Sequence, residues 1–143
     1  MGIVHIPWYA TGLRSDKMAA ALAGIVHIPW YATGLRGDKL AAALAEISPI
    51  ALRYGARTHA IYRFNDDRYK FMQFAEFEAK DQWEAYWYGP EFTDFRTVCS
   101  SWYQVPVLYG WTELVTSGSM LPERAHSASG DPVGAEPGGD LVG

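Results

Sequence analysis

The first strongly patterned stretch of the chain changes from a strand period to a helical period. Ile25–Ala32 is rich in β-branched and aromatic residues and ends at a Thr-Gly pair, which predicts a strand followed by a turn. Asp38 stands where a helix N-cap is expected, Pro49 is expected to kink that helix, and Gly55 is expected to end it. The apolar face of the helix, with residues three or four positions apart, consists of Leu40, Leu44, Ile47, Ala51 and Tyr54.

Two further strands joined by a hairpin come next. The runs Arg57–Phe64 and Tyr69–Phe77 have strand patterns, and the polar connection Asn65–Arg68 is typical of a hairpin. Because side chains alternate along a strand, the second run separates into two faces. One face would carry Phe71, Gln73, Ala75 and Phe77, and the other Lys70, Met72, Phe74 and Glu76.

The remaining patterned region predicts more helix and a closing strand. A helix over Lys80–Tyr86 is interrupted by a Gly-Pro pair and resumes over Glu91–Trp102. A last strand is expected over Val105–Val115. The order β-α-β-β-α-β is that of a ferredoxin-like α+β fold, a four-stranded antiparallel sheet with the helices on one face. The other face would be apolar and bare, so we expect it to pair face to face in a homodimer or a higher homo-oligomer.

A repeat precedes this region and a low-complexity tail follows it. Gly2–Ala23 recurs as Gly24–Ala45 with 20 of 22 positions identical. We expect the second copy to be the integral one, because it continues into Glu46 without a helix-breaking glycine. In the tail, 13 of 27 residues are Gly, Pro or Ser and none is aromatic, which predicts disorder. The sequence thus predicts a duplicated strand–helix segment (1–23), an α+β domain (24–116) and a disordered tail (117–143).

Composition narrows the classes of partner. The 143 residues carry a formal net charge of −4 and a single cysteine, Cys99. A mildly acidic chain lacks the basic surface that binds nucleic acid or anionic lipid, so we expect neither nucleic acid nor membrane as a partner. No segment approaches the roughly 20 apolar residues of a membrane helix, and the N-terminus lacks the basic residues of a signal peptide. We therefore expect a cytoplasmic protein.

Three polar side chains on predicted strands are candidates for catalysis. His27 and His59 have the pKa range of a general base or a haem ligand, although isolated strand histidines are more often structural or surface groups. Arg63 shares a strand face with His59 and would hold a phenolate or carboxylate. Arg63 would equally pair with Asp66 or Asp67 at the hairpin.

Aromatic residues, 15% of the chain, are the unusual feature of its composition. They would line a cleft for a flat ligand or fill the core and a dimer contact. The candidates for such a cleft are Tyr31, Tyr62, Phe77, Tyr86 and Trp87. No metal site is expected, because the Asn-Asp-Asp run at the hairpin is turn chemistry. Cys99 is expected to be a buried, unreactive thiol.

The stretch Gly55–Phe95 resembles the antibiotic-biosynthesis-monooxygenase type of dimeric α+β barrel. The shared pattern is a glycine after the first helix, a tyrosine-bearing strand, a short Asn/Asp-rich hairpin, a strand ending in an aromatic residue and Glu, and a Pro-x-Phe segment at Pro90–Phe92. The similarity extends in element order over Ile25–Val115. It implies oxygenation of phenolic or quinol-type substrates without metal or flavin, whereas other relatives bind haem. The sequence departs from the family where many members have a tryptophan, here Phe77, and a histidine, here Tyr86.

Two functions therefore stay open from the sequence. The resemblance implies a monooxygenase-like protein that acts on an aromatic small molecule and needs no cofactor, with haem as the alternative. The second is a non-enzymatic assembly protein that oligomerises through its sheet face and the duplicated segment Gly2–Ala23. The departures at Phe77 and Tyr86 favour the second, and the pattern of elements favours the first.

Overall fold

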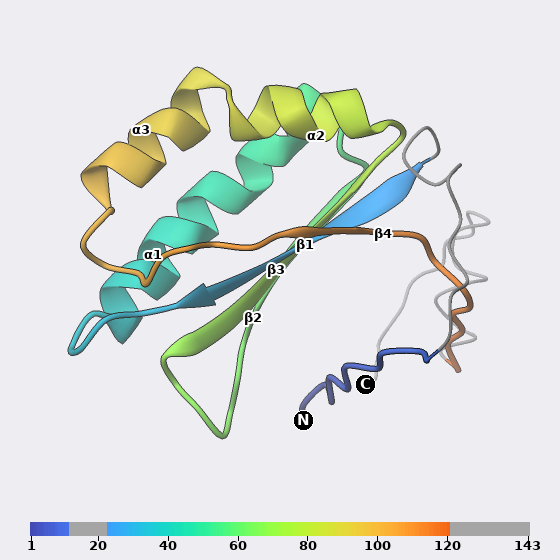
Figure 1. Ribbon diagram of the computed structural model, residues 1–143, viewed down its shortest axis with the longest axis horizontal. Helices are drawn as coiled ribbons and strands as arrows, with labels where there is room; N and C mark the ends of the chain where they lie inside the picture. The colour runs from blue at the N-terminus through green and yellow to red at the C-terminus, as the bar shows by residue number, and fades with distance from the viewer. Residues whose placement is uncertain (12–22, 121–143) are drawn as a thin grey trace, which may run out of the picture.

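The computed structural model describes residues 1–11 and 23–120 and contains a four-stranded antiparallel sheet with its helices on one face (Figure 1). The strands are β1 (Gly24–Tyr31), β2 (Thr58–Arg63), β3 (Lys70–Phe77) and β4 (Gly110–Thr112), arranged in the order β2-β3-β1-β4. The helices are α1 (Gly37–Ile47), the 3-10 helix η2 (Ser48–Tyr54), α2 (Lys80–Trp87) and α3 (Pro90–Val98). The α+β, ferredoxin-like fold expected from the sequence is confirmed.

The two faces of β3 divide as the alternation predicted. Phe71, Ala75 and Phe77 belong to the core between the sheet and the helices, and Gln73 on the same face is fully buried. On the opposite face Phe74 is half-buried, while Met72 is only 3% exposed. The register places Ala75 between Val26 of β1 and His59 of β2, so these three residues face the helices.

The first helix differs from the prediction at both ends. Its N-cap is Arg36, without a side-chain capping bond, and Asp38 lies in the first turn. The α-helical bonding ends at Ile47 and the chain continues as η2, because Pro49 near its start cannot donate the backbone hydrogen bond of an α-helix. Gly55 ends η2 with φ 101°, a left-handed conformation that favours glycine, as expected.

The predicted closing strand Val105–Val115 is largely wrong. Only Gly110–Thr112 forms β4, and α3 likewise ends at Val98 rather than extending to Trp102. Pro106 cannot donate to a strand ladder, so the chain before β4 follows β1 without pairing regularly. After α3 the chain meets the end of β1 through the bridge between Ala32 and Tyr103, and the backbone N–H of Gln104 donates to the Tyr31 oxygen at 2.8 Å.

The second copy of the repeat supplies β1 and α1. The two copies differ at Ser15 and Gly37, and a Cβ on Gly37 would lie 2.7 Å from Nη2 of Arg63. Glycine at this position therefore admits the Arg63 guanidinium next to α1. In the first copy, Gly2–Thr11 forms no strand or helix, and residues 12–22 lie outside the described residues.

The predicted tail begins at Ser117. Residues 117–120 have no regular secondary structure, and residues 121–143 lie outside the described residues. The three-part division of the chain stays a prediction. Within residues 1–11 and 23–120, the helices are too short and too polar to cross a membrane.

Candidate functional site

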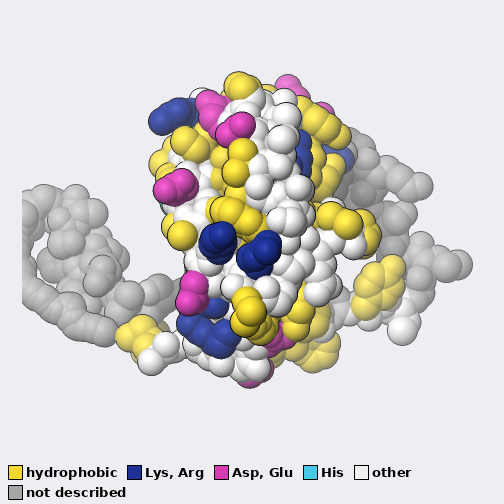
Figure 2. All heavy atoms as spheres, turned by 90° about the vertical axis from the view of Figure 1, so that its left-hand side faces the viewer, with side chains coloured by type: hydrophobic (Ala, Val, Ile, Leu, Met, Phe, Trp, Pro, Cys, Tyr) yellow, Lys and Arg dark blue, Asp and Glu magenta, His cyan; other side chains and the backbone are white. Residues whose placement is uncertain are grey.

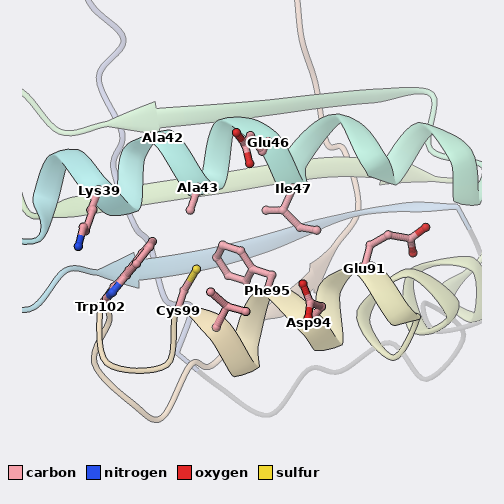
Figure 3. Close-up of a pocket in the computed structure, with 11 residues that line it drawn as sticks. Lys39, Ala42, Ala43, Glu46, Ile47, Glu91, Asp94, Phe95, Cys99 and Trp102 are labelled. Atoms are coloured by element: carbon pink, nitrogen blue, oxygen red, sulfur yellow. The ribbon is translucent and has the colours of Figure 1, made fainter.

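A groove of about 410 Å³ runs between α1 and α3 on the helical side of the molecule (Figure 3). It exists because α1 presents the small residues Ala42 and Ala43 toward α3, which leaves space between the two helices. Its floor is apolar, with Phe95 and Cys99 of α3 and its C-cap opposite Ile47 of α1. The full lining is Lys39, Ala42, Ala43, Glu46, Ile47, Glu91, Asp94, Phe95, Val98, Cys99 and Trp102.

The groove is basic and aromatic at one end. Trp102 is half-buried beside the start of α1, and the Lys39 ammonium lies 5.0 Å from the centroid of its ring. Figure 2 views the molecule from this side, where basic side chains lie beside exposed hydrophobic ones. A flat ligand that stacked on the indole would lie next to a positive charge.

The other end of the groove is acidic. Glu46 and Asp94 project into it from α1 and α3 (Figure 3). Glu91 lies farther along α3 and accepts a hydrogen bond of 2.6 Å from the Tyr54 hydroxyl, which is the largest cause of its lowered pKa. Burial, and then the charges of Asp94 and Glu46, raise the pKa of the Cys99 thiol. Cys99 is therefore a buried thiol and not an activated nucleophile, as expected.

The two histidines predicted to be catalytic lie on opposite faces of the sheet. His59 faces the helices, and its Nδ1 lies 3.0 Å from the Ser48 hydroxyl oxygen. His27 faces away from them, with its ring 5.3 Å from that of Phe74. Burial lowers the pKa of His27, and the charge of His5 lowers it further. The structure therefore does not bring His27 and His59 together.

Arg63 shares the His59 face, as predicted, but its donors contact other partners than those expected. Its Nη1 donates to Asp38 at 2.9 Å and its Nε to the backbone oxygen of Arg68 at 2.7 Å. The guanidinium also lies 5.1 Å from the centroid of the Phe71 ring. Arg63 thus connects β2 to α1 and the hairpin.

The predicted aromatic cleft residues fall into two groups on opposite sides of the sheet. Tyr31 and Tyr62 are exposed on the face away from the helices, and Tyr31 donates to Asp67 at 2.8 Å. Phe77 and Tyr86 are fully buried under the helices, and Trp87 is half-buried there. The aromatic side chains that are at most 1% exposed in that interior are Trp30, Phe71, Phe77, Trp83, Tyr86 and Phe92. None of the five predicted residues lines the groove between α1 and α3.

Sequence reasoning missed several residues with unusual surroundings. Among the described residues, Trp83 Nε1 and Arg96 Nη1 are buried without a hydrogen-bond partner. The Arg96 guanidinium lies 4.1 Å from the Trp87 ring centroid, and burial lowers its pKa. The groove residues had one sequence signal, the alanine run of α1, but nothing in the sequence told which helix would lie opposite.

Metal and haem find little support in the described ranges. Residues 1–11 and 23–120 contain no group of three or more His, Cys, Asp or Glu arranged to hold a metal ion. Haem needs an axial ligand, and the groove offers only the Cys99 thiol, whose raised pKa disfavours the thiolate. The groove residues do not fit haem.

Comparison with known proteins identifies the fold. No family model matches the sequence, and no curated protein matches it significantly. A putative antibiotic biosynthesis monooxygenase from Nitrosomonas europaea is 13% identical, with a TM-score of 0.60 over 68% of this chain and 96% of that one. Another from Bordetella bronchiseptica is 14% identical, with a TM-score of 0.59 over 66% of this chain and 99% of that one.

A third similar structure belongs to an oxygenase. SnoaB, a cofactor-independent oxygenase from Streptomyces nogalater, is 16% identical, with a TM-score of 0.55 over 71% of this chain and 99% of that one. The resemblance seen in the sequence is thereby confirmed at the level of architecture: this chain has the fold of the antibiotic biosynthesis monooxygenase-like proteins.

Proposed function

We propose that the chain is a cofactor-independent oxygenase of phenolic or quinol-type aromatic compounds, with its ligand in the groove between α1 and α3. The fold shared with SnoaB supports the class of reaction. The observation that carries the choice of site is the polarity of the groove, where Lys39 and Trp102 lie at one end and Glu46 and Asp94 toward the other.

Each end of the groove suits one part of such a ligand. A phenolate oxygen would accept a hydrogen bond from the Lys39 ammonium while its ring stacked on Trp102. The ammonium would stabilise the phenolate and so lower the pKa of the bound phenol. Lys39 and Glu46 are seven positions apart on α1, which corresponds to roughly 10 Å along a helix. A ligand that contacts both would therefore be an extended, fused-ring phenol.

The reaction balances without a cofactor. A phenol with a free ring C–H position reacts with dioxygen so that one oxygen atom becomes a new carbonyl and the other leaves as water. All electrons that reduce dioxygen come from the phenol, which ends as a quinone. The substrate binds at Lys39 as the phenolate, so its hydroxyl proton has already passed to solvent. Glu46 and Asp94, toward the other end, would accept the proton that leaves the reacting ring carbon, and the apolar floor around Phe95 would exclude water from that carbon.

The test combines binding with oxygen uptake. Hydroxylated naphthalenes and anthracenes would be titrated against the full chain by tryptophan fluorescence, with dioxygen consumption measured alongside. Lys39→Met should weaken binding of the phenolate at least about tenfold, the loss expected for a charge-assisted hydrogen bond. Lys80→Met on α2, outside the groove, is the matched control. Binding that Lys39→Met leaves unchanged would contradict the proposed site.

A second candidate function, assembly without catalysis, is supported by a different observation. The interior between sheet and helices, which the sequence left open as either a cleft or a packed core, is filled by large aromatic side chains such as Trp30 and Trp83. We propose in this case that the chain forms homodimers through the sheet face opposite the helices. Sedimentation of the full chain tests this pairing: a monomer at all concentrations would contradict it.

A further inference from the structure

The sheet face opposite the helices is in contact with the N-terminal copy of the repeat. We name this surface the open sheet face; its hydrophobic and aromatic members include Ile25, His27, Pro29, Tyr62, Met72 and Phe74. His5 stacks on His27 with 5.7 Å between ring centroids and an interplanar angle of 13°. It also packs edge-on against Phe64, again at 5.7 Å. In Figure 1 the N-terminus lies on the side of the sheet away from the helices.

This N-terminal strap, Gly2–Thr11, is held at few points. A Cβ on Gly2 would lie 3.3 Å from the Asn65 amide nitrogen, which places the start of the strap against the hairpin. Between and beyond these contacts its apolar side chains remain exposed, with Ile3 at 69% and Trp8 at 86%. Because little apolar area is buried, the histidine stack contributes a large part of the contact.

We infer that the N-terminal strap is a pH-sensitive cover of the open sheet face, and that acidification lifts it so that a second copy of the chain occupies this face. The inference rests on the pairing of sheet faces proposed above and goes beyond it, because it assigns a regulatory role to the duplicated segment. A strap over His27 and a second copy on the same face exclude each other sterically. The protonation state of the stack therefore sets how often the face is free.

The charges around the stack favour release at low pH. Two stacked imidazolium rings repel each other, and the ammonium of Lys70, on β3, lies 4.6 Å from the Phe64 ring that His5 contacts. Glu76, also on this face of β3, pairs with Arg57 at 3.9 Å, while β4 carries no ionisable side chain in Gly110–Thr112. This face also carries the hydroxyls of Tyr31 and Tyr62, and the Tyr31 hydroxyl donates to the Asp67 carboxylate at 2.8 Å.

The direction of the pH response follows from proton linkage. The covered state holds His27 with a pKa below its ordinary value of 6.5, through burial and through His5. When the strap lifts, His27 loses the neighbouring charge of His5, both in the free chain and in the dimer, and takes up its proton more readily. The lifted state therefore binds more protons, and lowering the pH through about 6.5 shifts the population toward it. One such proton favours lifting by up to about tenfold between pH 7.5 and 5.5.

The experiment measures the dimer dissociation constant of the full chain by sedimentation at pH 7.5 and 5.5. For the wild type it should fall by up to about tenfold on acidification. His5→Phe keeps a flat ring on His27 without a titrating group, so it should reduce the pH response. His5→Glu places a carboxylate beside His27 and should invert the response, since the protonated His27 then attracts the strap. His59→Gln, on the other sheet face, is the matched control and should respond like the wild type.

A second readout separates failure of the strap from failure of dimerisation. NMR titration of the His27 ring should give a pKa below the ordinary value, and His5→Phe should raise it. An ordinary His27 pKa that His5→Phe leaves unchanged would overturn the strap even if dimers form. The strap would also be overturned if the dimer dissociation constants of the wild type and His5→Phe changed equally with pH. If the chain stays monomeric while His5→Phe still changes the pKa of His27, the strap contacts His27 but a second copy of the chain does not occupy the open sheet face. That result would overturn this part of the inference.

Discussion

Trp30 donates its indole N–H to the side-chain oxygen of Gln73 at 3.0 Å, and both residues are buried, with Trp30 1% and Gln73 0% exposed. The bond continues as a chain through the core, because Gln73 donates to the Tyr86 hydroxyl at 3.2 Å and that hydroxyl donates to the Ile47 oxygen at 2.7 Å. One buried polar network thus joins β1, β3, α2 and α1. A network without unsatisfied members fixes how these elements pack, whereas an apolar core alone tolerates repacking.

The network predicts that Tyr86 has a structural role. Tyr86→Phe removes the hydroxyl, leaves the Ile47 oxygen and the Gln73 amide without their partner, and should lower the free energy of unfolding by about 1–3 kcal/mol. Urea unfolding measures this, with the exposed Tyr88→Phe as the control, expected within about 0.5 kcal/mol of the wild type. Loss of ligand binding by Tyr86→Phe at unchanged stability would instead support Tyr86 as a substrate-binding residue.

The groove predicts that bulk on one face of α1 blocks ligand binding. Ala42 lines the groove, whereas Ala45 is also exposed on α1 but lies outside it. Ala42→Trp should abolish binding of fused-ring phenols, and Ala45→Trp should leave it unchanged. Both changes should cost less than about 1 kcal/mol of stability, because both sites are exposed helical positions. Equal loss of binding in the two variants would argue against the groove.

The hydrogen bond between Tyr54 and Glu91 predicts a pH dependence of stability. It lowers the pKa of Glu91 in the folded chain, so its stabilising effect is present above the ordinary glutamate pKa of 4.5 and is lost as the pH falls through the lowered value. Urea midpoints between pH 6 and 3 should therefore decrease less steeply for Glu91→Gln than for the wild type. Parallel pH profiles for the two proteins would show that Glu91 does not contribute.

The sequence predicted the elements whose signal is local and failed where an element depends on distant partners. The strand Ile25–Ala32 and the hairpin at Asn65–Arg68 have strong periods and turn residues, and both are close to their observed bounds. The closing strand was overextended, because a β-rich composition says nothing about which backbone is free to pair with it. Of the predicted run Val105–Val115, only Gly110–Thr112 pairs with β1 as a strand.

The candidate site was harder to predict for the same reason. Arg63 was placed on the correct face by alternation, but its partner Asp38 lies 25 positions away, on α1. The stack of His5 on His27 joins two copies of one sequence position, and no local pattern distinguishes that contact from a second strand. To predict the groove, one would have to know which helix packs against α1.

The last prediction uses Cys99 as a reporter of the groove. The thiol lines the groove but is only 5% exposed, and burial, then Asp94 and Glu46, raise its pKa. Alkylation by iodoacetamide at pH 8 should therefore be slower in the folded chain than in urea, because the raised pKa lowers the thiolate fraction and burial restricts access of the reagent. A fused-ring phenol in the groove should slow the reaction further, whereas in Ala42→Trp the same phenol should have no effect. Mass spectrometry of the intact chain follows the reaction. Protection of Cys99 by the phenol in Ala42→Trp would mean that the ligand binds elsewhere and acts on the thiol through the stability of the fold.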